Sequence, residues 1–172
     1  MIHFEDILYL EKGNKIQKKA FQLLKSLNIM DLLARFDPIL VGTIPINIAI
    51  EGSDLDIICY WEDKAEFERI IKGRFSDSRG FTISESDYSG ELSVVSNFMA
   101  GNFKVEIFGQ NIPTRFQNGY LHMLAEYHLL NEHGEGFRQK VLNLKKSGVK
   151  TEPAFCQILG IEGDPYQELL KL

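Results

Sequence analysis

The sequence predicts an α/β (α+β) fold, with a mixed β-sheet flanked by helices and a C-terminal helical cap. Two observations lead to this prediction. Between residues 38 and 110, short apolar or alternating runs are separated by glycine-containing turns, which is typical of strands. Residues 14–30 and much of 111–172 instead have apolar residues at helical spacing. We expect a single domain, 1–172, with a core over 1–110 and a helical region over 111–172.

The N-terminal part predicts one helix and one short strand. Residues 14–30 place apolar side chains three or four positions apart, and Asn14 is suited to cap the helix. Residues 38–43 (PILVGT) predict a buried strand that ends at its glycine. Residues 44–50 alternate isoleucine with other residues, but Pro45 favours an edge strand or an irregular extended segment.

The middle of the chain predicts a strand, a helix and three more strands, over residues 54–60, 62–75, 80–86, 91–99 and 103–108. The first of these runs, DLDIICY, is the clearest strand in the sequence. Residues 87–90 (DYSG) and 100–102 (AGN) are turn sequences between the last three strands. The second turn predicts a β-hairpin that ends in the run FKVEIF.

The C-terminal part predicts helices only. Residues 114–117 (TRFQ) fit the capping-box pattern, so we expect a helix to begin there with Phe116 on its apolar face. Gly134 is expected to stop that helix. Further helices are predicted over residues 137–146, from 152 to 160, and from 164 onward, where Asp164 precedes a proline suited to a first helical turn.

Composition limits the kinds of partner that we expect. The chain has 172 residues, is 44% hydrophobic and carries a formal net charge of -5. Long nucleic acid is therefore not expected, because such binding depends mainly on Lys and Arg at phosphates. The N-terminus has no secretory-signal pattern, and no apolar run approaches the roughly 20 residues of a membrane span. We expect a cytoplasmic protein with a small-molecule substrate and no membrane partner.

Two aspartates at the start of the clearest strand are the first candidate functional residues. Successive side chains of a strand point to opposite faces, so Asp54 and Asp56 share one face and Leu55 and Ile57 take the other. Two carboxylates on one dry face repel each other, and a divalent cation between them removes that repulsion. Carboxylates are hard ligands that suit Mg²⁺. A polar strand start on a solvated face is the alternative interpretation.

Residues before this strand are candidates for binding phosphate. Gly42 ends a predicted strand, where a glycine lets the backbone approach a ligand closely. Backbone N–H groups there, followed by the Thr43 hydroxyl, can hold a phosphate. Ser53, directly before the two aspartates, could also contact a phosphate or could serve only as a turn residue.

Charged residues on a later strand complete the set. Lys104 and Glu106 share one face of the run FKVEIF, and the apolar residues between them take the other. Glu106 is a candidate third carboxylate, or a simple cross-strand partner for a lysine. Lys104 could contact a phosphate or form an ion pair. Three carboxylates from two adjacent strands can hold two metal ions about 3.5–4 Å apart.

These motifs together resemble a known superfamily. The order apolar–Gly–Ser/Thr, a gap of about ten residues, Asp–apolar–Asp–apolar, and then an acidic residue on a later strand is similar to the polymerase-beta-like nucleotidyltransferases. Here it reads Val41-Gly42-Thr43, Asp54-Leu55-Asp56-Ile57 and Glu106. The segments GTIPINIAIEGSDLDIIC, KVEIFGQNIP and KTEPAFCQILGIEGDPYQELL resemble a bacterial family within it, catalogued as a domain of unknown function. This closer resemblance covers most of the chain.

The resemblance implies a nucleotidyltransferase-like mixed sheet and a metal-dependent activity. Asp54 and Asp56 would bind Mg²⁺ or Mn²⁺, and Glu106 would be the third carboxylate, which helps to activate the attacking hydroxyl. Gly42 and Thr43 would contact the triphosphate. The implied reaction transfers a nucleoside monophosphate from a nucleoside triphosphate, which we expect to be ATP, to a hydroxyl of a small-molecule or protein acceptor.

Two alternatives follow from the same residues. The chain could be a non-catalytic nucleotide-binding or antitoxin-like interaction module of the same fold, with a protein partner. It could also be a metal-dependent phosphohydrolase, in which water is the acceptor.

Overall fold

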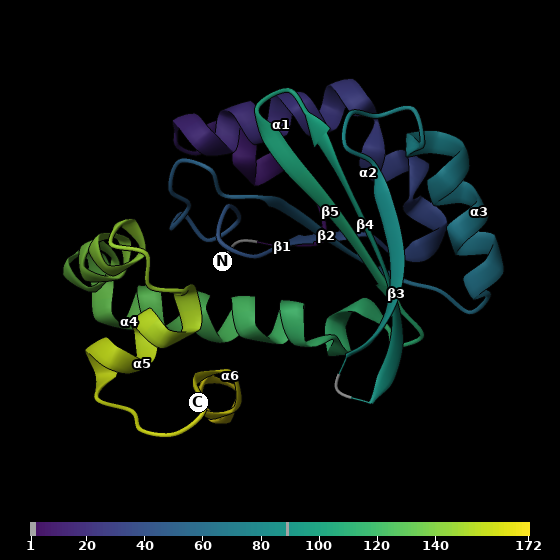
Figure 1. Ribbon diagram of the computed structural model, residues 1–172. Helices are drawn as coiled ribbons and strands as arrows, with labels where there is room; N and C mark the ends of the chain where they lie inside the picture. The colour runs from purple at the N-terminus through teal and green to yellow at the C-terminus, as the bar shows by residue number, and fades with distance from the viewer. Residues whose placement is uncertain (1–2, 89) are drawn as a thin grey trace.

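A five-stranded mixed sheet forms the centre of the computed structural model, which describes residues 3–88 and 90–172. The strands lie in the order β1–β2–β5–β4–β3 (Figure 1). Strands β2 and β5 are parallel, and the other neighbouring pairs are antiparallel. The strands are β1 (Ile39–Val41), β2 (Leu55–Tyr60), β3 (Thr82–Tyr88), β4 (Glu91–Ala100) and β5 (Phe103–Gln110).

The helices fall into an N-terminal group and a C-terminal group. They are α1 (Lys15–Leu27), α2 (Ile29–Leu32), α3 (Lys64–Phe75), α4 (Asn118–Lys146), α5 (Thr151–Leu159) and α6 (Pro165–Glu168). Short 3-10 helices lie at Leu8–Lys12, Ala34–Phe36, Thr114–Phe116 and Leu169–Lys171. No helix in the described part of the chain is long and apolar enough to cross a membrane.

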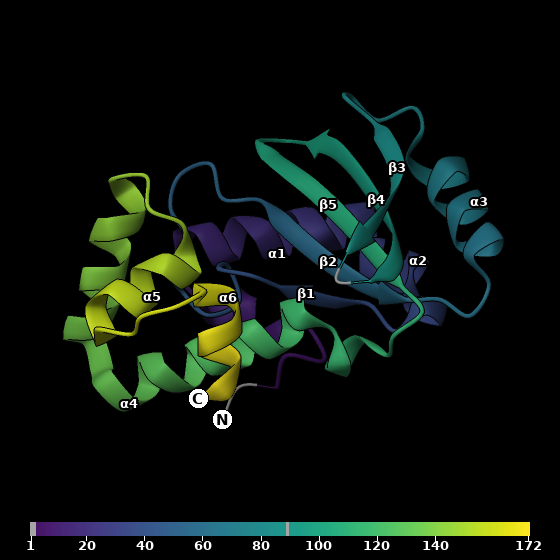
Figure 2. The same cartoon turned by 60° about the horizontal axis from the view of Figure 1, so that its bottom comes forward.

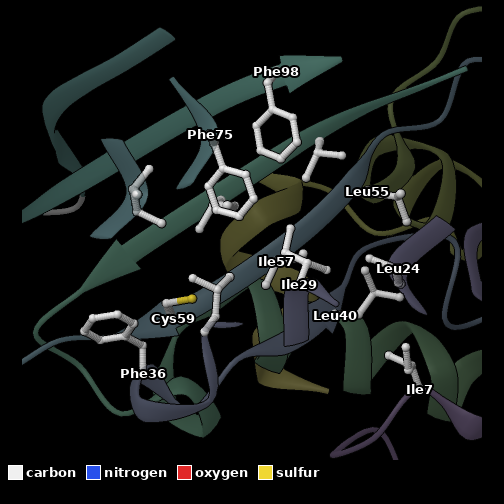
Figure 3. Close-up of a cluster of buried hydrophobic side chains, with 14 of the residues drawn as sticks. Ile7, Leu24, Ile29, Phe36, Leu40, Leu55, Ile57, Cys59, Phe75 and Phe98 are labelled. Carbon is white, nitrogen blue, oxygen red and sulfur yellow. The ribbon is translucent and has the colours of Figure 1, made fainter. Parts of the chain in front are cut away.

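The two groups of helices cover opposite faces of the sheet (Figures 1 and 2). One face presents Leu55, Ile57 and Cys59 of β2 to a core that α1, α2 and α3 complete (Figure 3). The other face presents Ile58 of β2 to a second core, formed largely by α4 and α5. Successive side chains of a strand point to opposite faces. The polar side chains of β2, which alternate along the strand with Leu55, Ile57 and Cys59, therefore lie on the face toward α4 and α5.

Local sequence signals explain several boundaries. The Asn14 side chain accepts hydrogen bonds from the backbone N–H groups of Ile16 and Gln17, and the Gln17 side chain accepts one from the Asn14 N–H. This reciprocal cap begins α1, as the sequence predicts. Gly134, with φ at 74°, interrupts the helical backbone of α4 at the position where a stop is predicted. Asp164 caps α6, which has a proline in its first turn.

The predicted capping box at residues 114–117 is wrong. The Thr114 hydroxyl donates to Asp37 Oδ2 at 2.5 Å, and the Gln117 amide donates to the carbonyl oxygens of Cys59 and Ile112. Helix α4 begins at Asn118 without a side-chain cap, and Phe116 is 71% exposed and does not join its apolar face. Long-range partners outcompete the local pattern, because they satisfy buried polar groups that the local cap would leave unpaired.

The single helix predicted over residues 14–30 is wrong, because Asn28, with φ at 51°, separates α1 from α2. The remaining predicted elements are present and differ in length. Residues 44–50 form turns and irregular backbone, as Pro45 indicates. Strand β3 extends to Tyr88, so the turn predicted over 87–90 is shorter, and its Ser89 lies outside the described residues. The mixed sheet flanked by helices confirms the predicted fold class.

Candidate active site

Asp56 and Glu106 lie side by side on the face of the sheet that faces α4 and α5. Strand β2 pairs with β5 in parallel, and Asp56 is the register partner of Glu106. Register partners on neighbouring strands project from the same face, so the two carboxylates converge, although β3 and β4 separate them in the sequence. Both side chains are partly buried and line one cavity.

Asp54 lies two residues before Asp56, just outside β2, and has a cationic partner. Lys104 Nζ is 3.2 Å from Asp54 Oδ2. The side chains of Lys104 and Asp54 are 44% and 35% exposed, so solvent screens the pair. Burial lowers the pKa of Lys104, but the hydrogen bond to Asp54 and the nearby carboxylates outweigh this effect and raise it. Asp54 and Lys104 therefore form an ion pair at the rim of the site, beside the Asp56–Glu106 pair.

The turn after β1 approaches the Asp56 carboxylate from the other side. Val41 is the register partner of Asp56 on β1, so Gly42 and Thr43 follow directly beside the acidic pair. Gly42 has a φ of 79°, in the left-handed region that favours glycine. Both residues line the cavity with Asp56 and Glu106. The structure therefore brings this turn together with two of the three predicted carboxylates, Asp56 and Glu106, whereas Asp54 does not line the cavity.

Ser53 has a local structural contact instead of a place in the cavity. Its hydroxyl oxygen accepts a hydrogen bond from the Ile50 N–H at 3.0 Å, and its own N–H donates to the Ile50 carbonyl. These bonds close the turn that leads into Asp54. Of the phosphate-binding candidates, Gly42 and Thr43 line the cavity, whereas Ser53 and Lys104 do not.

The cavity has a volume of about 340 Å³ and lies between the sheet and the C-terminal helices. Its sheet side includes the Gly42–Thr43 turn, Asp56 and Glu106. Its helical side consists of residues of α4, α5 and α6, among them Asn118, His122, Met123, Glu126, Glu152 and Tyr166. The C-terminal helices thus form the second wall of the candidate site.

Two acidic residues of this helical wall are absent from the sequence prediction. Glu126 is only 3% exposed, and Glu152 stands in the first turn of α5. One signal for Glu126 is present in the sequence, because it lies three residues after Met123 and four before Leu130, on the apolar face of α4. A charged residue at an apolar position of a helix indicates either a paired core charge or a functional group.

Burial and like charges change the pKa values of these groups. Burial, the Glu106 charge and the Asp54 charge raise the pKa of Asp56 to about 7. Burial and the Glu152 charge raise the pKa of Glu126 to about 8. Burial lowers the pKa of Lys145, whose Nζ donates to the Thr151 hydroxyl at 2.9 Å. The cavity is therefore a desolvated site with an excess of carboxyl groups.

The carboxylates do not form a complete metal-binding cluster with the side chains in these positions. Among the described residues, no three His, Cys, Asp or Glu side chains are grouped closely enough to hold a metal ion. Asp56 and Glu106 are register partners, and the third candidate ligand, Asp54, is turned toward Lys104.

Comparisons with known proteins give one family and a set of structural neighbours. A model of the family described as "Domain of unknown function (DUF4269)" matches residues 22–172. No curated protein matches the chain. The polymerase core of TRAMP, an RNA surveillance complex, aligns with a TM-score of 0.55 and 14% identity, over 92% of this chain and 57% of that chain.

Two further solved structures have the same fold. The GLD-2/RNP-8 complex aligns with a TM-score of 0.53 and 14% identity, over 91% of this chain and 63% of that chain. Cid1, described with an RNA terminal uridylyl transferase activity, aligns with a TM-score of 0.53 and 14% identity, over 77% of this chain and 41% of that chain. The chain spans less than two thirds of each neighbour, and the similarity establishes a nucleotidyltransferase fold.

Proposed function

The chain belongs to the family described as "Domain of unknown function (DUF4269)", and on the geometry of its acidic site we propose that it is a metal-dependent nucleotidyltransferase. It transfers a nucleoside monophosphate from a nucleoside triphosphate, which we expect to be ATP, to a hydroxyl of a small-molecule or protein acceptor. The observation that carries the proposal is the register of Asp56 with Glu106 beside the Gly42–Thr43 turn.

The donor atoms suit a hard divalent cation once Asp54 turns from Lys104 toward Asp56 and Glu106. Asp56 and Glu106 offer carboxylate oxygens from neighbouring strands, and Asp54 is two residues away on the same chain segment. Oxygen ligands of this kind suit Mg²⁺ or Mn²⁺. When bound, the cation would neutralise charge on the phosphate oxygens and polarise the reacting groups. Asp54, Asp56 and Glu106 would hold it, with Asp54 released from Lys104.

The proposed reaction exchanges one phosphorus–oxygen bond for another. The acceptor oxygen forms a bond to the α-phosphorus, and the bond from that phosphorus to the bridging oxygen of pyrophosphate breaks. The Glu106 carboxylate takes the proton of the acceptor hydroxyl, and pyrophosphate leaves with the bonding electron pair. Glu106 suits this role because it projects into the cavity beside Asp56.

The Gly42–Thr43 turn and Lys104 would bind the triphosphate. Gly42 has no β-carbon, so backbone N–H groups at this turn can approach phosphate oxygens closely. The Thr43 hydroxyl lines the same cavity. Lys104, once separated from Asp54, would offer an ammonium group to the phosphates at the rim. Ser53 would contribute by holding the turn that positions Asp54.

Calorimetry of triphosphate binding tests this proposal. We expect ATP to bind the purified chain in the presence of Mg²⁺ and to bind much more weakly after Mg²⁺ is chelated. The double variant Asp54→Asn with Asp56→Asn should lose this metal dependence. Asp77→Asn, at an exposed position remote from the cavity, is the matched control and should bind as the wild type does. Unchanged affinity and metal dependence in the double variant would refute the proposal.

The Lys104–Asp54 ion pair favours a second candidate function, a nucleotide-binding or antitoxin-like module without turnover. In that case the pair persists with nucleotide bound, and no complete set of metal ligands forms. Incubation with α-labelled ATP and a metabolite extract separates the two functions. Transfer of label to an organic acceptor supports the transferase, and transfer to water alone indicates a phosphohydrolase. Triphosphate binding without any turnover supports the module.

A further inference from the structure

The helical wall of the cavity has its own group of polar side chains, opposite the acidic pair. His122 and Glu126 lie four residues apart on α4, so they occupy the same helix face. Glu152, in the first turn of α5, lines the cavity with them. We call these three residues the helical acidic wall. None of them belongs to the motif that is proposed to bind the triphosphate.

Glu126 and His122 both lack a partner that their burial would ordinarily require. Glu126 is 3% exposed, and among the described residues its carboxyl group has no hydrogen bond or ion pair; the Lys145 charge only partly offsets the rise in its pKa. His122 is 8% exposed, and its Nδ1 has no hydrogen-bond partner. Buried polar groups are nearly always hydrogen-bonded, and leaving one unsatisfied costs about 1–3 kcal/mol. Two such groups on one wall of a cavity indicate that a ligand supplies their partners.

The charge of the cavity selects the kind of ligand. Four carboxyl groups line it, those of Asp56, Glu106, Glu126 and Glu152, and no Lys or Arg is found among its described lining residues. Lys145 does not line the cavity; its Nζ donates to the Thr151 hydroxyl, and its charge lowers the pKa values of Glu126 and Asp56 without offsetting the effect of burial. An ionised carboxylate only accepts hydrogen bonds, so a ligand that binds these residues in their ionised form must be a donor. An ammonium group satisfies both the charge and the hydrogen-bonding requirement.

An organic cation fits this wall better than a metal ion. The described residues contain no group of three His, Cys, Asp or Glu side chains that could hold a metal, and this includes the helical acidic wall. The cavity of about 340 Å³ is in the size range of small-molecule sites. It reaches from the Asp56–Glu106 pair to Glu126 and Glu152, so one small molecule can contact both walls.

We propose that the acceptor is a small hydroxylated amine, whose ammonium group binds Glu126 and Glu152 while its hydroxyl faces Glu106. This assignment rests on the proposed transferase function for the role of the hydroxyl. The binding of the ammonium group is independent of that function. His122 Nδ1 supplies a further polar contact to the same molecule. Glu126 is thus a specificity-determining residue that distinguishes a cationic acceptor from a neutral one.

Binding of matched pairs of probes tests the proposal without any nucleotide. Glucosamine is compared with glucose, and 3-amino-1,2-propanediol with glycerol, by calorimetric titration and thermal shift of the wild-type chain. We expect at least one amine to bind about tenfold or more tightly than its neutral counterpart, which corresponds to about 1.4 kcal/mol. The Glu126→Gln variant should lose this preference. Glu132→Gln, an exposed position on the same helix, is the matched control and should keep it.

The remaining outcomes overturn the proposal. Equal binding of amines and neutral probes, binding of neither, or an amine preference that persists in Glu126→Gln would each contradict it. If Glu126→Gln does not fold, Glu152→Gln at the partly exposed end of the wall takes its place, with the same expected loss. Failure of the transferase function is a separate result, because Asp54→Asn should abolish metal-dependent ATP binding and leave amine binding unchanged. Asp54 does not line the cavity.

Discussion

The Asp56 carboxylate packs so closely against Gly42 that a β-carbon at position 42 would lie 2.6 Å from Asp56 Oδ2. Gly42 also has a φ of 79°, which side chains rarely adopt. The glycine therefore serves two purposes: it allows the chain to turn after β1, and it leaves room for a carboxylate at the centre of the candidate site.

Gly42→Ala should abolish triphosphate binding and destabilise the fold. The left-handed backbone costs a residue with a β-carbon about 1–2 kcal/mol, and the clash displaces Asp56. Gly52→Ala is the control, because Gly52 has a φ of 85° but open space around its β-carbon position. Both variants should lose stability in urea denaturation, and only Gly42→Ala should lose ATP binding by calorimetry. Equal ATP binding in the two variants would contradict the close approach.

Lys104→Gln should have opposite effects on metal and nucleotide binding. Removing the ammonium group frees Asp54, so Mn²⁺ without nucleotide should bind several-fold more tightly. ATP with Mg²⁺ should bind more weakly, because a cation beside the phosphates is lost. Manganese paramagnetic titration and calorimetry measure the two effects. Lys140→Gln, at an exposed position, should change neither, and unaltered Mn²⁺ affinity in Lys104→Gln would show that the ion pair does not compete with the metal.

Glu126→Gln should stabilise the fold increasingly as the pH rises. The pKa of Glu126 is about 8 in the folded chain, against an ordinary value of 4.5, so the folded state holds more protons than the unfolded state between these values. The wild type therefore loses stability from pH 4.5 to 8, and the variant avoids this loss. We expect a gain on the order of 2–4 kcal/mol at pH 9 and almost none at pH 4. Urea denaturation at several pH values measures it, and a gain independent of pH would refute the titration of Glu126.

Gln117→Ala should loosen the attachment of α4 to the sheet. The Gln117 amide donates to the Cys59 carbonyl at 2.8 Å and to the Ile112 carbonyl at 2.7 Å, and the side chain is buried. Its removal leaves buried acceptors without a donor, so we expect a loss of about 1–3 kcal/mol in urea denaturation. Gln139→Ala is the control, because its amide contacts only Glu135 at the surface. Similar stability of the two variants would mean that the Gln117 bonds do not anchor the helix.

The sheet and half of the candidate site could be predicted from the sequence for a physical reason. Alternation along a strand determines which residues share a face of the sheet. The local sequence alone therefore places Asp56 on the opposite face from Ile57, and Glu106 on the opposite face from Ile107. The pairing of β2 with β5 does not follow in this way, because β3 and β4 lie between them in the chain. The resemblance to a known superfamily supplied that link.

The helical wall could not be predicted, because tertiary packing determines it. Glu126 lines the cavity only when α4 lies across the sheet, and Glu152 does so only when α5 folds back against α4. Thr114 and Gln117 illustrate the same limit, since their partners Asp37 and Cys59 lie more than 50 residues away. The division at residue 110 between a core and a helical region stays a prediction.

The parallel pairing of β2 and β5 determines which changes in chain length the molecule can tolerate. Each of the two strands carries one carboxylate, and the segment between them, residues 61–102, can gain or lose residues at its turns without moving either. A single residue inserted within β5 before Glu106 would instead shift its alternation by one position. Glu106 would then point toward α1 and α3, where apolar side chains would surround it.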